Sequence, residues 1–278
     1  MKRIVALTLI VAGLVVTAAC AGPFQKQRPV SRGQSPSPVE YRTHCTGWGD
    51  PRLSLTGSDR PLVWVLDGAG DLKGCSNALA AASAAVGHPV EFEVFPWSHG
   101  YRRLLMDQIG MNHAREQGNR LAAAILDRKA REPDRRVVVV GHSAGCAVAL
   151  AAGDVLPADA IDRMILLAPS VSTGYDLRPS LWSAKEGVDV YCSRKDWVAL
   201  GFVMRVVGTT DNFWSGAAAG RLGFKPKKGS PLAAEEAARL RQHFWSEEVA
   251  WTGHDGGHHG MHAPEFVKAY LLPQMTGN

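Results

Sequence analysis

Short strand-like segments, most of them apolar throughout, alternate with helical segments over most of the chain, and this alternation limits the folds open to it. The strands are predicted at residues 62–66, 90–95, 137–140, 163–167 and 187–192. Strands that are apolar on both sides need cover on both faces, as in a mostly parallel sheet between two helical layers. The chain is therefore predicted to have an α/β fold, with a mostly parallel central sheet and helices on both faces.

Helical patterns occupy the segments between and after these strands. The helices are predicted at residues 77–86, 107–131, 144–152, 232–244 and 265–272. A further short strand is expected at 249–251. Residues 201–230, which contain several glycines and a basic Lys-Pro-Lys-Lys segment, are interpreted as an excursion over one end of the sheet. A chain of 278 residues with this pattern is expected to form one folded domain.

The N-terminus has the pattern of a secretory signal. Lys2 and Arg3 precede sixteen uncharged residues, 4–19, which are fewer than the ~20 needed to span a bilayer as a helix. The following Thr-Ala-Ala-Cys segment resembles a bacterial lipobox, in which Cys20 would be acylated, although Thr17 stands where leucine is usual. Cleavage at an Ala-x-Ala-like site, which would release a soluble protein, remains an alternative. Both alternatives predict export.

The segment after Cys20 resembles a flexible tether, since residues 21–40 are rich in Pro, Ser, Gln, Gly and Arg and have no apolar period. The predicted organisation is a signal segment at 1–19, a tether at 20–43 and a folded domain at 44–278. The net charge of +5 includes the signal's two cations, and no run of five like charges occurs. Nucleic acid is therefore not expected as a partner. The expected location is the cell envelope, through an N-terminal lipid anchor, or otherwise the periplasm or medium.

The four cysteines after Cys20 fall into two groups. Cys45 and Cys75 lie in loop-like sequence, and export would place them where disulfides persist, so they form a possible disulfide. Cys146 and Cys192 lie in apolar segments and are expected to be buried as small hydrophobic residues. No Cys-x-x-Cys pair occurs, which disfavours a thiolate zinc site.

The segment Gly-His-Ser-Ala-Gly at 141–145 matches the pattern Gly-x-Ser-x-Gly. It directly follows an apolar strand and directly precedes a helix of small residues, which is the setting of a nucleophile elbow. There the glycines permit a sharp turn that exposes the Ser143 hydroxyl at the carboxyl edge of the sheet. In these residues the chain resembles the α/β-hydrolase family, over about residues 60–273, and the resemblance implies a serine nucleophile.

In that family an acid follows the serine at the end of a later strand. Asp196 lies just after the strand predicted at 187–192 and is the expected acid. Asp176, Asp189 and Asp211 are rivals. Asp189 lies inside the strand, Asp176 follows the preceding one, and Asp211 is deep in the excursion. The resemblance therefore favours Asp196.

The resemblance implies a histidine near the C-terminus, and a glycine-rich loop before the last predicted helix contains four. His258 is preferred as the base, with His254 and His259 as alternatives. The cluster could instead bind a metal, since imidazole is a common zinc ligand. The spacing matches no recognised site and no other cluster offers ligands, so no metal is expected.

The segment Asp-Gly-Ala-Gly at 67–70 ends the first predicted strand and resembles the His-Gly-x-Gly oxyanion loop of the family, with Asp67 replacing histidine. The resemblance implies an oxyanion hole formed by the backbone N–H groups of Ala69 and Ala144. A simple turn at the strand end is an alternative. A dinucleotide-binding fingerprint is disfavoured, because Lys73 stands where its third glycine is required.

An aromatic-rich loop, residues 97–101, follows the second predicted strand at the same edge of the sheet. Its tryptophan, Trp97, fits either a substrate pocket or the core. Ser98 and His99 are neighbours in sequence, which is no evidence of a catalytic dyad.

Together these residues predict a serine hydrolase that cleaves a small-molecule or lipid ester, or a related acyl bond, through an acyl-enzyme and without a cofactor. Peptide and thioester bonds are alternatives that the same residues could cleave. Two other classes remain open: a non-catalytic surface lipoprotein that uses the fold as a binding scaffold, and a metal-binding lipoprotein that uses the histidine loop.

Overall fold

The protein forms a six-stranded parallel sheet in the order β2-β1-β3-β4-β5-β6. The computed structural model describes residues 60–196, 199–200, 208–211, 218–225 and 229–277. The strands are β1 (Leu62–Leu66), β2 (Glu91–Val94), β3 (Val137–His142), β4 (Arg163–Leu167), β5 (Val188–Cys192) and β6 (Leu240–Phe244). This architecture confirms the predicted α/β class.

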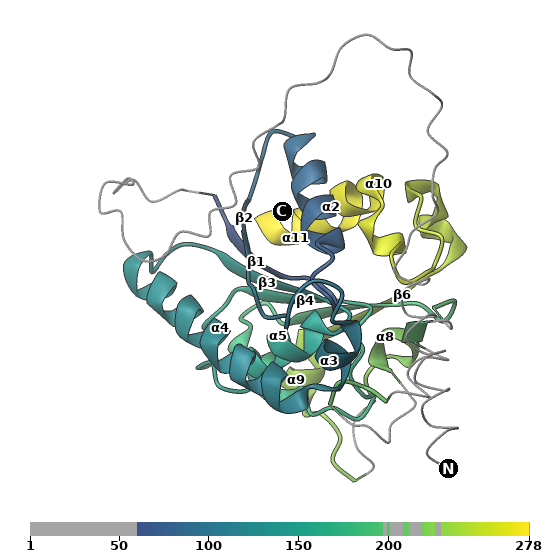
Figure 1. Ribbon diagram of the computed structural model, residues 1–278. Coiled ribbons are helices and arrows are strands. Elements are labelled where there is room, and N and C mark those ends of the chain that lie inside the picture. The colour runs from purple at the N-terminus through teal and green to yellow at the C-terminus, as the bar shows by residue number, and fades with distance from the viewer. Residues whose placement is uncertain (1–59, 197–198, 201–207, 212–217, 226–228, 278) are drawn as a thin grey trace.

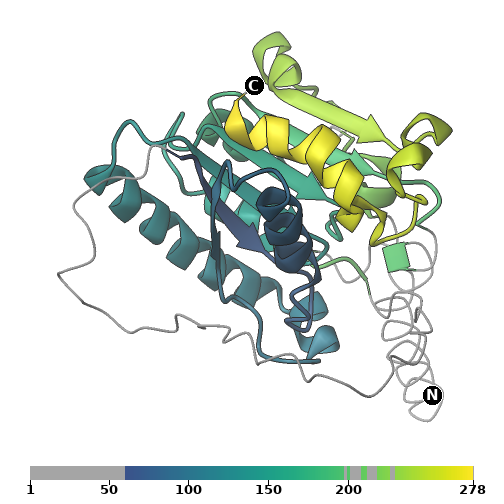
Figure 2. The same ribbon diagram turned by 90° about the horizontal axis from the view of Figure 1, so that it is seen from above.

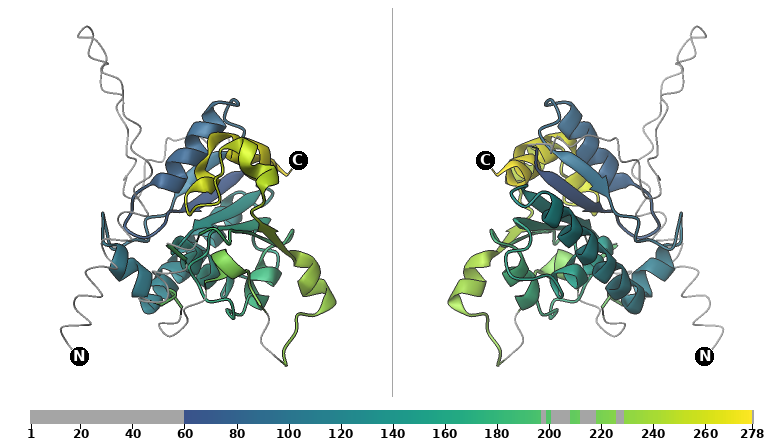
Figure 3. Two further views of the ribbon diagram at one scale, coloured as in Figure 1. Left: turned by 90° about the vertical axis from the view of Figure 1, so that its right-hand side faces the viewer. Right: turned by 90° about the vertical axis from the view of Figure 1, so that its left-hand side faces the viewer.

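Helices cover both faces of the sheet, as Figures 1 and 3 show. One face carries α3 (Leu104–Ile109), α4 (Met111–Arg131), α5 (Gly145–Gly153), α6 (Arg178–Ser183), α8 (Ala219–Leu222) and α9 (Ala234–Arg239). The other face carries α2 (Gly74–Ala84) and the C-terminal helical segment, which Figure 2 shows side by side.

A hydrophobic core lies on each face of the sheet, and the two cores follow from the alternation of side chains along the buried strands. On β1, Leu62 and Trp64 contribute to the core under α4 and α5, whereas Val63 and Val65 contribute to the core under α2. Strand β3 alternates in the same way. Because every residue of β1 and β3 is buried, each needs a helical layer on both sides, as the apolar patterns predicted.

The helix predicted at 232–244 is wrong. Only Ala234–Arg239 is helical, and Leu240–Phe244 forms the edge strand β6, paired in register with β5. Edge strands keep one side in solvent, so the polar residues of β6 concealed the strand from a pattern search for apolar runs. Its Arg241 and His243 contact Asp189 of β5.

The structure also corrects the predictions for two other segments. The helix predicted at 107–131 is two helices, α3 and α4, because the backbone leaves helical geometry at Gly110. The strand expected at 249–251 is instead part of a 3-10 helix, η2 (Glu247–Thr252).

The closing helix, predicted at 265–272, is longer than expected. It extends over α10 (Pro264–Phe266), a π-helical turn η4 (Val267–Leu271) and α11 (Leu272–Thr276). The π turn lies just before Pro273, which has no N–H group for a regular helical hydrogen bond. A short 3-10 turn, η3 (Gly260–His262), leads into this segment.

Several predictions fall on the N-terminal residues 1–59, which lie outside the described ranges. These are the signal segment, Cys20, the tether and Cys45. Cys75 carries a free, buried thiol at the second position of α2, and its pairing with Cys45 stays a prediction. Among the described residues, no helix combines the length and apolar character needed to cross a membrane.

Candidate active site

Ser143 lies in a sharp turn between β3 and α5, at the carboxyl end of the sheet. Its φ of 52° is in the left-handed region, which is unusual for a residue with a side chain. Gly145 makes the turn possible, since a Cβ there would lie 2.5 Å from the carbonyl oxygens of Leu66 and Asp67. The strand, turn and helix therefore form the elbow that the sequence predicted.

The structure brings Ser143, His258 and Asp196 together from segments far apart in the chain. Nε2 of His258 lies 3.0 Å from Oγ of Ser143, and Nδ1 of His258 lies 2.6 Å from Oδ2 of Asp196. The side chains of His258 and Asp196 are 8% and 3% exposed. With Nδ1–H donating to the carboxylate, Nε2 has a free lone pair to accept the serine proton.

The loops that carry His258 and Asp196 are tied to each other and to the sheet. Oγ of Ser193, which follows β5, donates a hydrogen bond to the carbonyl of Gly256 in the histidine loop. Nε1 of Trp245, which follows β6, donates to the carbonyl of His254 at 2.8 Å. These bonds limit the freedom of the base relative to the acid, which preorganises the pair.

The rival carboxylates have other partners. Asp176 binds Arg178, Asp211 accepts the backbone N–H and hydroxyl of Ser172, and Asp189 binds two arginines and His243. Within the described residues, only Asp196 contacts His258 through a carboxylate.

The rival histidines also have other neighbours. Burial lowers the pKa of His254 to about 4, and its Nδ1 accepts the N–H of Gly256 at 3.1 Å. His259 packs against His142 and His262, with ring centroids 5.5 Å and 5.2 Å apart. The geometry therefore favours His258 as the partner of Ser143.

The loop after β1 lies against the elbow. A Cβ at Gly68 would lie 3.4 Å from Cβ of Ser143 and 3.0 Å from Nδ1 of His142, so the backbone approaches closely only because residue 68 is glycine. The N–H groups of Ala69 and Ala144 donate no hydrogen bond to another described residue. Their role as an oxyanion hole stays a prediction.

Asp67 stands where the family commonly has histidine, and the structure shows what the aspartate does. Its Oδ1 accepts the N–H groups of Cys75 and Ser76 at 2.9 Å and 3.0 Å. These are two of the otherwise unpaired donors in the first turn of α2. Asp67 therefore anchors α2 to the end of β1 by capping the helix from a distance.

Two residues support this loop through contacts that were not predicted from the sequence. Oδ2 of Asp107 accepts the N–H of Gly70 at 2.7 Å, and Nε1 of Trp97 donates to the carbonyl of Asp67 at 2.9 Å. Both side chains are buried, which places Trp97 in the core rather than in a pocket. Their partners lie 37 and 30 residues away, so no local pattern could have indicated the contacts.

A cavity of about 440 Å³ opens beside α5, beginning one turn after Ser143. Its lining combines small residues of α5 with polar residues from three other segments. The lining residues are Met111, Ala114, Arg115, Ala147, Ala151, Ser172, Gly174, Tyr175, Asp176, Thr210 and Asp211. None of these lining residues is Ser143, His258 or Asp196, so the cavity lies beside the proposed catalytic contacts and does not include them.

Two groups of side chains among the described residues have the composition of a metal site: His142 with His259 and His262, and His99 with Asp107 and His113. The second group is fully engaged in protein contacts. Asp107 accepts from the backbone and ring of His99, and Nε2 of His113 lies 2.6 Å from the carbonyl of Trp97. The first group is the stronger candidate, because Nε2 of His262 has no hydrogen-bond partner among the described residues, although Nε2 of His142 lies 3.3 Å from the carbonyl oxygen of His258.

No family model matches the chain, and no curated protein matches it. Among solved structures, the chain is similar to a cutinase-like protein from Cryptococcus sp., with 9% identity, 78% of this chain and 95% of that chain covered, and a TM-score of 0.39. It is also similar to the catalytic core domain of an acetyl xylan esterase from Trichoderma reesei, with 14% identity, coverage of 76% and 98%, and a TM-score of 0.38. A further acetylxylan esterase structure matches at 12% identity, coverage of 76% and 98%, and a TM-score of 0.39. Likenesses this weak support no inference about activity.

Proposed function

We propose that the protein is a serine hydrolase that cleaves an ester or a related acyl bond. The observation that supports this proposal is the continuous chain of contacts from Ser143 through His258 to Asp196. A serine hydroxyl is a weak nucleophile at neutral pH and needs an adjacent base that is held in one tautomer by a carboxylate. This chain of contacts meets both requirements.

The proposed reaction begins when Oγ of Ser143 attacks the acyl carbonyl carbon and its proton passes to Nε2 of His258. Asp196 stabilises the resulting imidazolium through Nδ1–H. The N–H groups of Ala69 and Ala144 stabilise the negative oxygen of the tetrahedral intermediate. The intermediate then expels the alcohol, which takes the proton from His258, and leaves an acyl group on Ser143. Water, activated by the same base, releases the acid, so the reaction requires no cofactor.

The first test is labelling of the purified mature chain with a fluorophosphonate, followed by mass spectrometry. We expect one adduct, on Ser143, that is lost in Ser143→Ala and retained in Ser246→Ala, an exposed serine away from the site. Folded protein without an adduct would contradict the proposal and support the binding-scaffold alternative. An adduct that persists in Ser143→Ala would show that another residue is the nucleophile.

The bond that is cleaved can be identified with p-nitrophenyl esters of increasing chain length, an acyl thioester and a peptide substrate. We expect the highest kcat/KM with short acyl esters, because several polar residues line the cavity beside α5. Preferential cleavage of the thioester or peptide would show that the substrate is not an ester, and the assignment of Ser143 as the nucleophile would be unaffected.

We also propose that the protein is exported and attached to a membrane through a lipid on Cys20, on the basis of the N-terminal sequence pattern. The expected result is a mature N-terminus at Cys20 that carries acyl groups and fractionates with membranes. Cys20→Ser should release the protein into the soluble fraction. A soluble, unacylated wild-type protein would instead support cleavage by an ordinary signal peptidase.

A further inference from the structure

Three histidines form a cluster behind the proposed base. His142 ends β3 beside Ser143, and His259 and His262 come from the histidine loop and the short turn η3 that follows it. One ring nitrogen from each lies within 4.8 Å of the other two. The ring centroids are 4.5 Å apart for His142 and His262, 5.5 Å for His142 and His259, and 5.2 Å for His259 and His262. The cluster thus joins the elbow to the histidine loop.

The spacing suits three ligands of one metal ion. At the widest spacing of 4.8 Å, the centre of the triangle lies about 2.8 Å from each nitrogen. A zinc–imidazole bond is about 2.0–2.1 Å long, so each nitrogen would move towards the centre of the triangle by at most about 0.8 Å. Small rotations of three side chains achieve this movement. Three nitrogens on one side of an ion leave a fourth position open for water, as tetrahedral coordination requires.

One atom of the cluster lacks a partner. Nε2 of His262 is buried and forms no hydrogen bond with any described residue. A buried polar atom without a partner is unusual in a native protein, and an ion or water that completes the site is a common reason. His262 thus supplies an observation independent of the spacing of the three rings.

We propose that His142, His259 and His262 bind one divalent transition-metal ion and that the ion holds the histidine loop against the elbow. Three imidazoles without a carboxylate favour Zn²⁺ over Mg²⁺ or Ca²⁺, which prefer oxygen ligands. His142 also approaches the carbonyl oxygen of His258 at 3.3 Å. The ion therefore lies behind the base and positions it, while the Ser143–His258 contact remains intact. The sequence alone did not predict this site, since its third ligand comes from the elbow, 117 residues before His259.

Binding can be measured by isothermal titration of the metal-free mature chain with Zn²⁺. We expect one ion per chain with micromolar or tighter affinity, and visible absorption typical of tetrahedral Co²⁺ when cobalt replaces zinc. His259→Ala and His262→Ala should each weaken binding at least tenfold, since loss of a ligand costs at least as much as loss of a residue that supports one. His88→Asn, at an exposed position outside the cluster, should bind as the wild type does.

Two further variants keep the test decisive if an alanine variant does not fold. His262→Cys retains a zinc ligand and should retain binding, with a thiolate-to-cobalt absorption band that the wild type lacks. Ser143→Ala should bind zinc normally, which separates the metal site from the proposed hydrolase activity. The proposal is wrong if folded wild-type chain binds no zinc. It is also wrong if His258→Gln abolishes binding while His262→Ala does not, because the ion would then lie on the base.

Discussion

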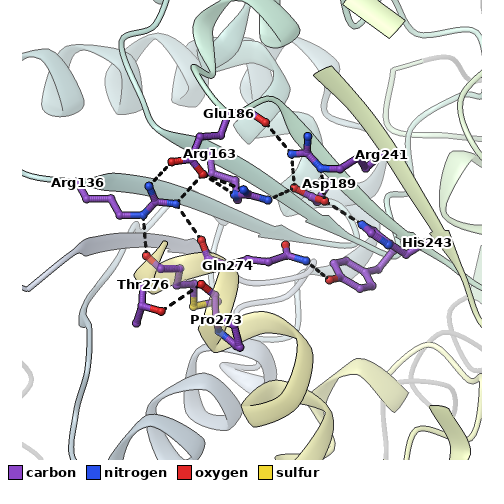
Figure 4. Close-up of polar contacts among 11 residues, drawn as sticks. Arg136, Arg163, Glu186, Asp189, Arg241, His243, Pro273, Gln274 and Thr276 are labelled. Atoms are coloured by element: carbon purple, nitrogen blue, oxygen red, sulfur yellow. Dashed lines mark hydrogen bonds and ion pairs between the residues drawn. The ribbon is translucent and has the colours of Figure 1, made fainter. Parts of the chain in front are cut away.

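Two aspartate–histidine pairs flank the same strand, β5, and they differ in what surrounds them. Asp196 follows the carboxyl end of β5 and contacts His258 at 2.6 Å. Asp189 lies inside β5 and contacts His243 of the neighbouring strand β6 at 2.8 Å (Figure 4). By distance and residue type the two pairs are nearly equivalent. They differ in their third partner, which is the group that the histidine of each pair contacts besides its aspartate.

Asp189 is the centre of an ion cluster. Its carboxylate binds Arg163 and Arg241 as well as His243. Figure 4 shows how Glu186, which also binds Arg163, extends the cluster to Arg136. Burial alone would raise the pKa of Asp189, but the hydrogen bonds from His243 and Arg241 and the arginine charges outweigh it and hold the pKa well below its usual value. A carboxylate with this many hydrogen-bond donors has a structural role.

The cluster also connects the sheet to the C-terminus of the chain. Arg136 of the loop before β3 binds Glu186 and donates to the carbonyls of Gln274 and Met275 in α11 (Figure 4). The ring of His243 stacks on Tyr191, with centroids 4.7 Å apart. By contrast, the donors to Asp196 among the described residues are His258 and, at 3.4 Å, the N–H of Leu200. The imidazole beside Asp196 reaches a serine, whereas the imidazole beside Asp189 reaches a ring.

The largest predicted difference between the pairs is in catalysis. Asp196→Asn should lower kcat for p-nitrophenyl acetate by about 10,000-fold, because the amide no longer holds His258 in the tautomer that accepts the serine proton. Asp189→Asn, the matched isosteric change, should leave kcat within about threefold. Steady-state kinetics of both variants make the comparison. An equal loss of kcat in the two variants would show that activity depends on the ion cluster around Asp189 and not on the contact between the histidine and Ser143.

The next difference is in stability and has the opposite order. Asp189→Asn should lower the free energy of unfolding by about 2–3 kcal/mol, less than for a fully buried pair because Arg163 and Arg241 are partly exposed. Asp196→Asn should cost less, since Asp196 pairs with one histidine and with no arginine among the described residues. Urea denaturation of both variants with a common m-value measures the difference. A greater loss in Asp196→Asn would contradict the structural role given to Asp189.

The same contrast between local and distant partners explains which features the sequence could predict. Strands β1 and β4 have the predicted bounds because their apolar runs are complete in themselves. The elbow is equally local, since strand, glycines and helix are adjacent in sequence. Strand β6 was predicted as helix because its polar residues Arg241 and His243 find their partner in Asp189, more than 50 residues earlier, and no local pattern indicates that pairing.

The candidate site divides in the same way. The resemblance to the α/β-hydrolase family, with its order of serine, acid and histidine, was enough to prefer Asp196 and His258, and in the structure His258 contacts both Asp196 and Ser143. The role of Asp107 at Gly70 and the contact of His142 with the histidine loop had no sequence signal, because each depends on how distant loops meet at the edge of the sheet. Pattern analysis detects elements, and packing determines these contacts.

The acid stability of the protein should depend on the ion cluster. The hydrogen bonds and charge of Arg136 and Arg163 outweigh burial and lower the pKa of Glu186 to about 2, and the pKa of Asp189 is lowered as well. In the unfolded chain these carboxyls titrate near 4, so the unfolded state binds more protons as the pH falls. The stabilisation is therefore complete above about pH 5 and is lost as the pH falls through 4 towards 2.

This pH dependence can be measured by urea denaturation between pH 6 and pH 3. Wild-type protein should lose stability more steeply below pH 4.5 than Asp189→Asn, in which one of the two carboxyls no longer titrates. Parallel curves for the two proteins would show that Asp189 has an ordinary pKa and that its arginine contacts are weak in solution.

The smallest effect should follow from replacing the histidine of the structural pair. In His243→Gln the carboxylate of Asp189 keeps both arginines, and the lost imidazole side chain was already 40% exposed, so the free energy of unfolding should fall by about 1 kcal/mol or less. His258→Gln removes the only base that contacts Ser143 among the described residues and should abolish labelling by a fluorophosphonate. The same substitution at the two histidines thus tests one difference between the pairs, which is whether the histidine contacts Ser143. If His243→Gln also abolished labelling while remaining folded, the two pairs would have to be coupled through β5, and the separation of structural and catalytic aspartates on that strand would fail.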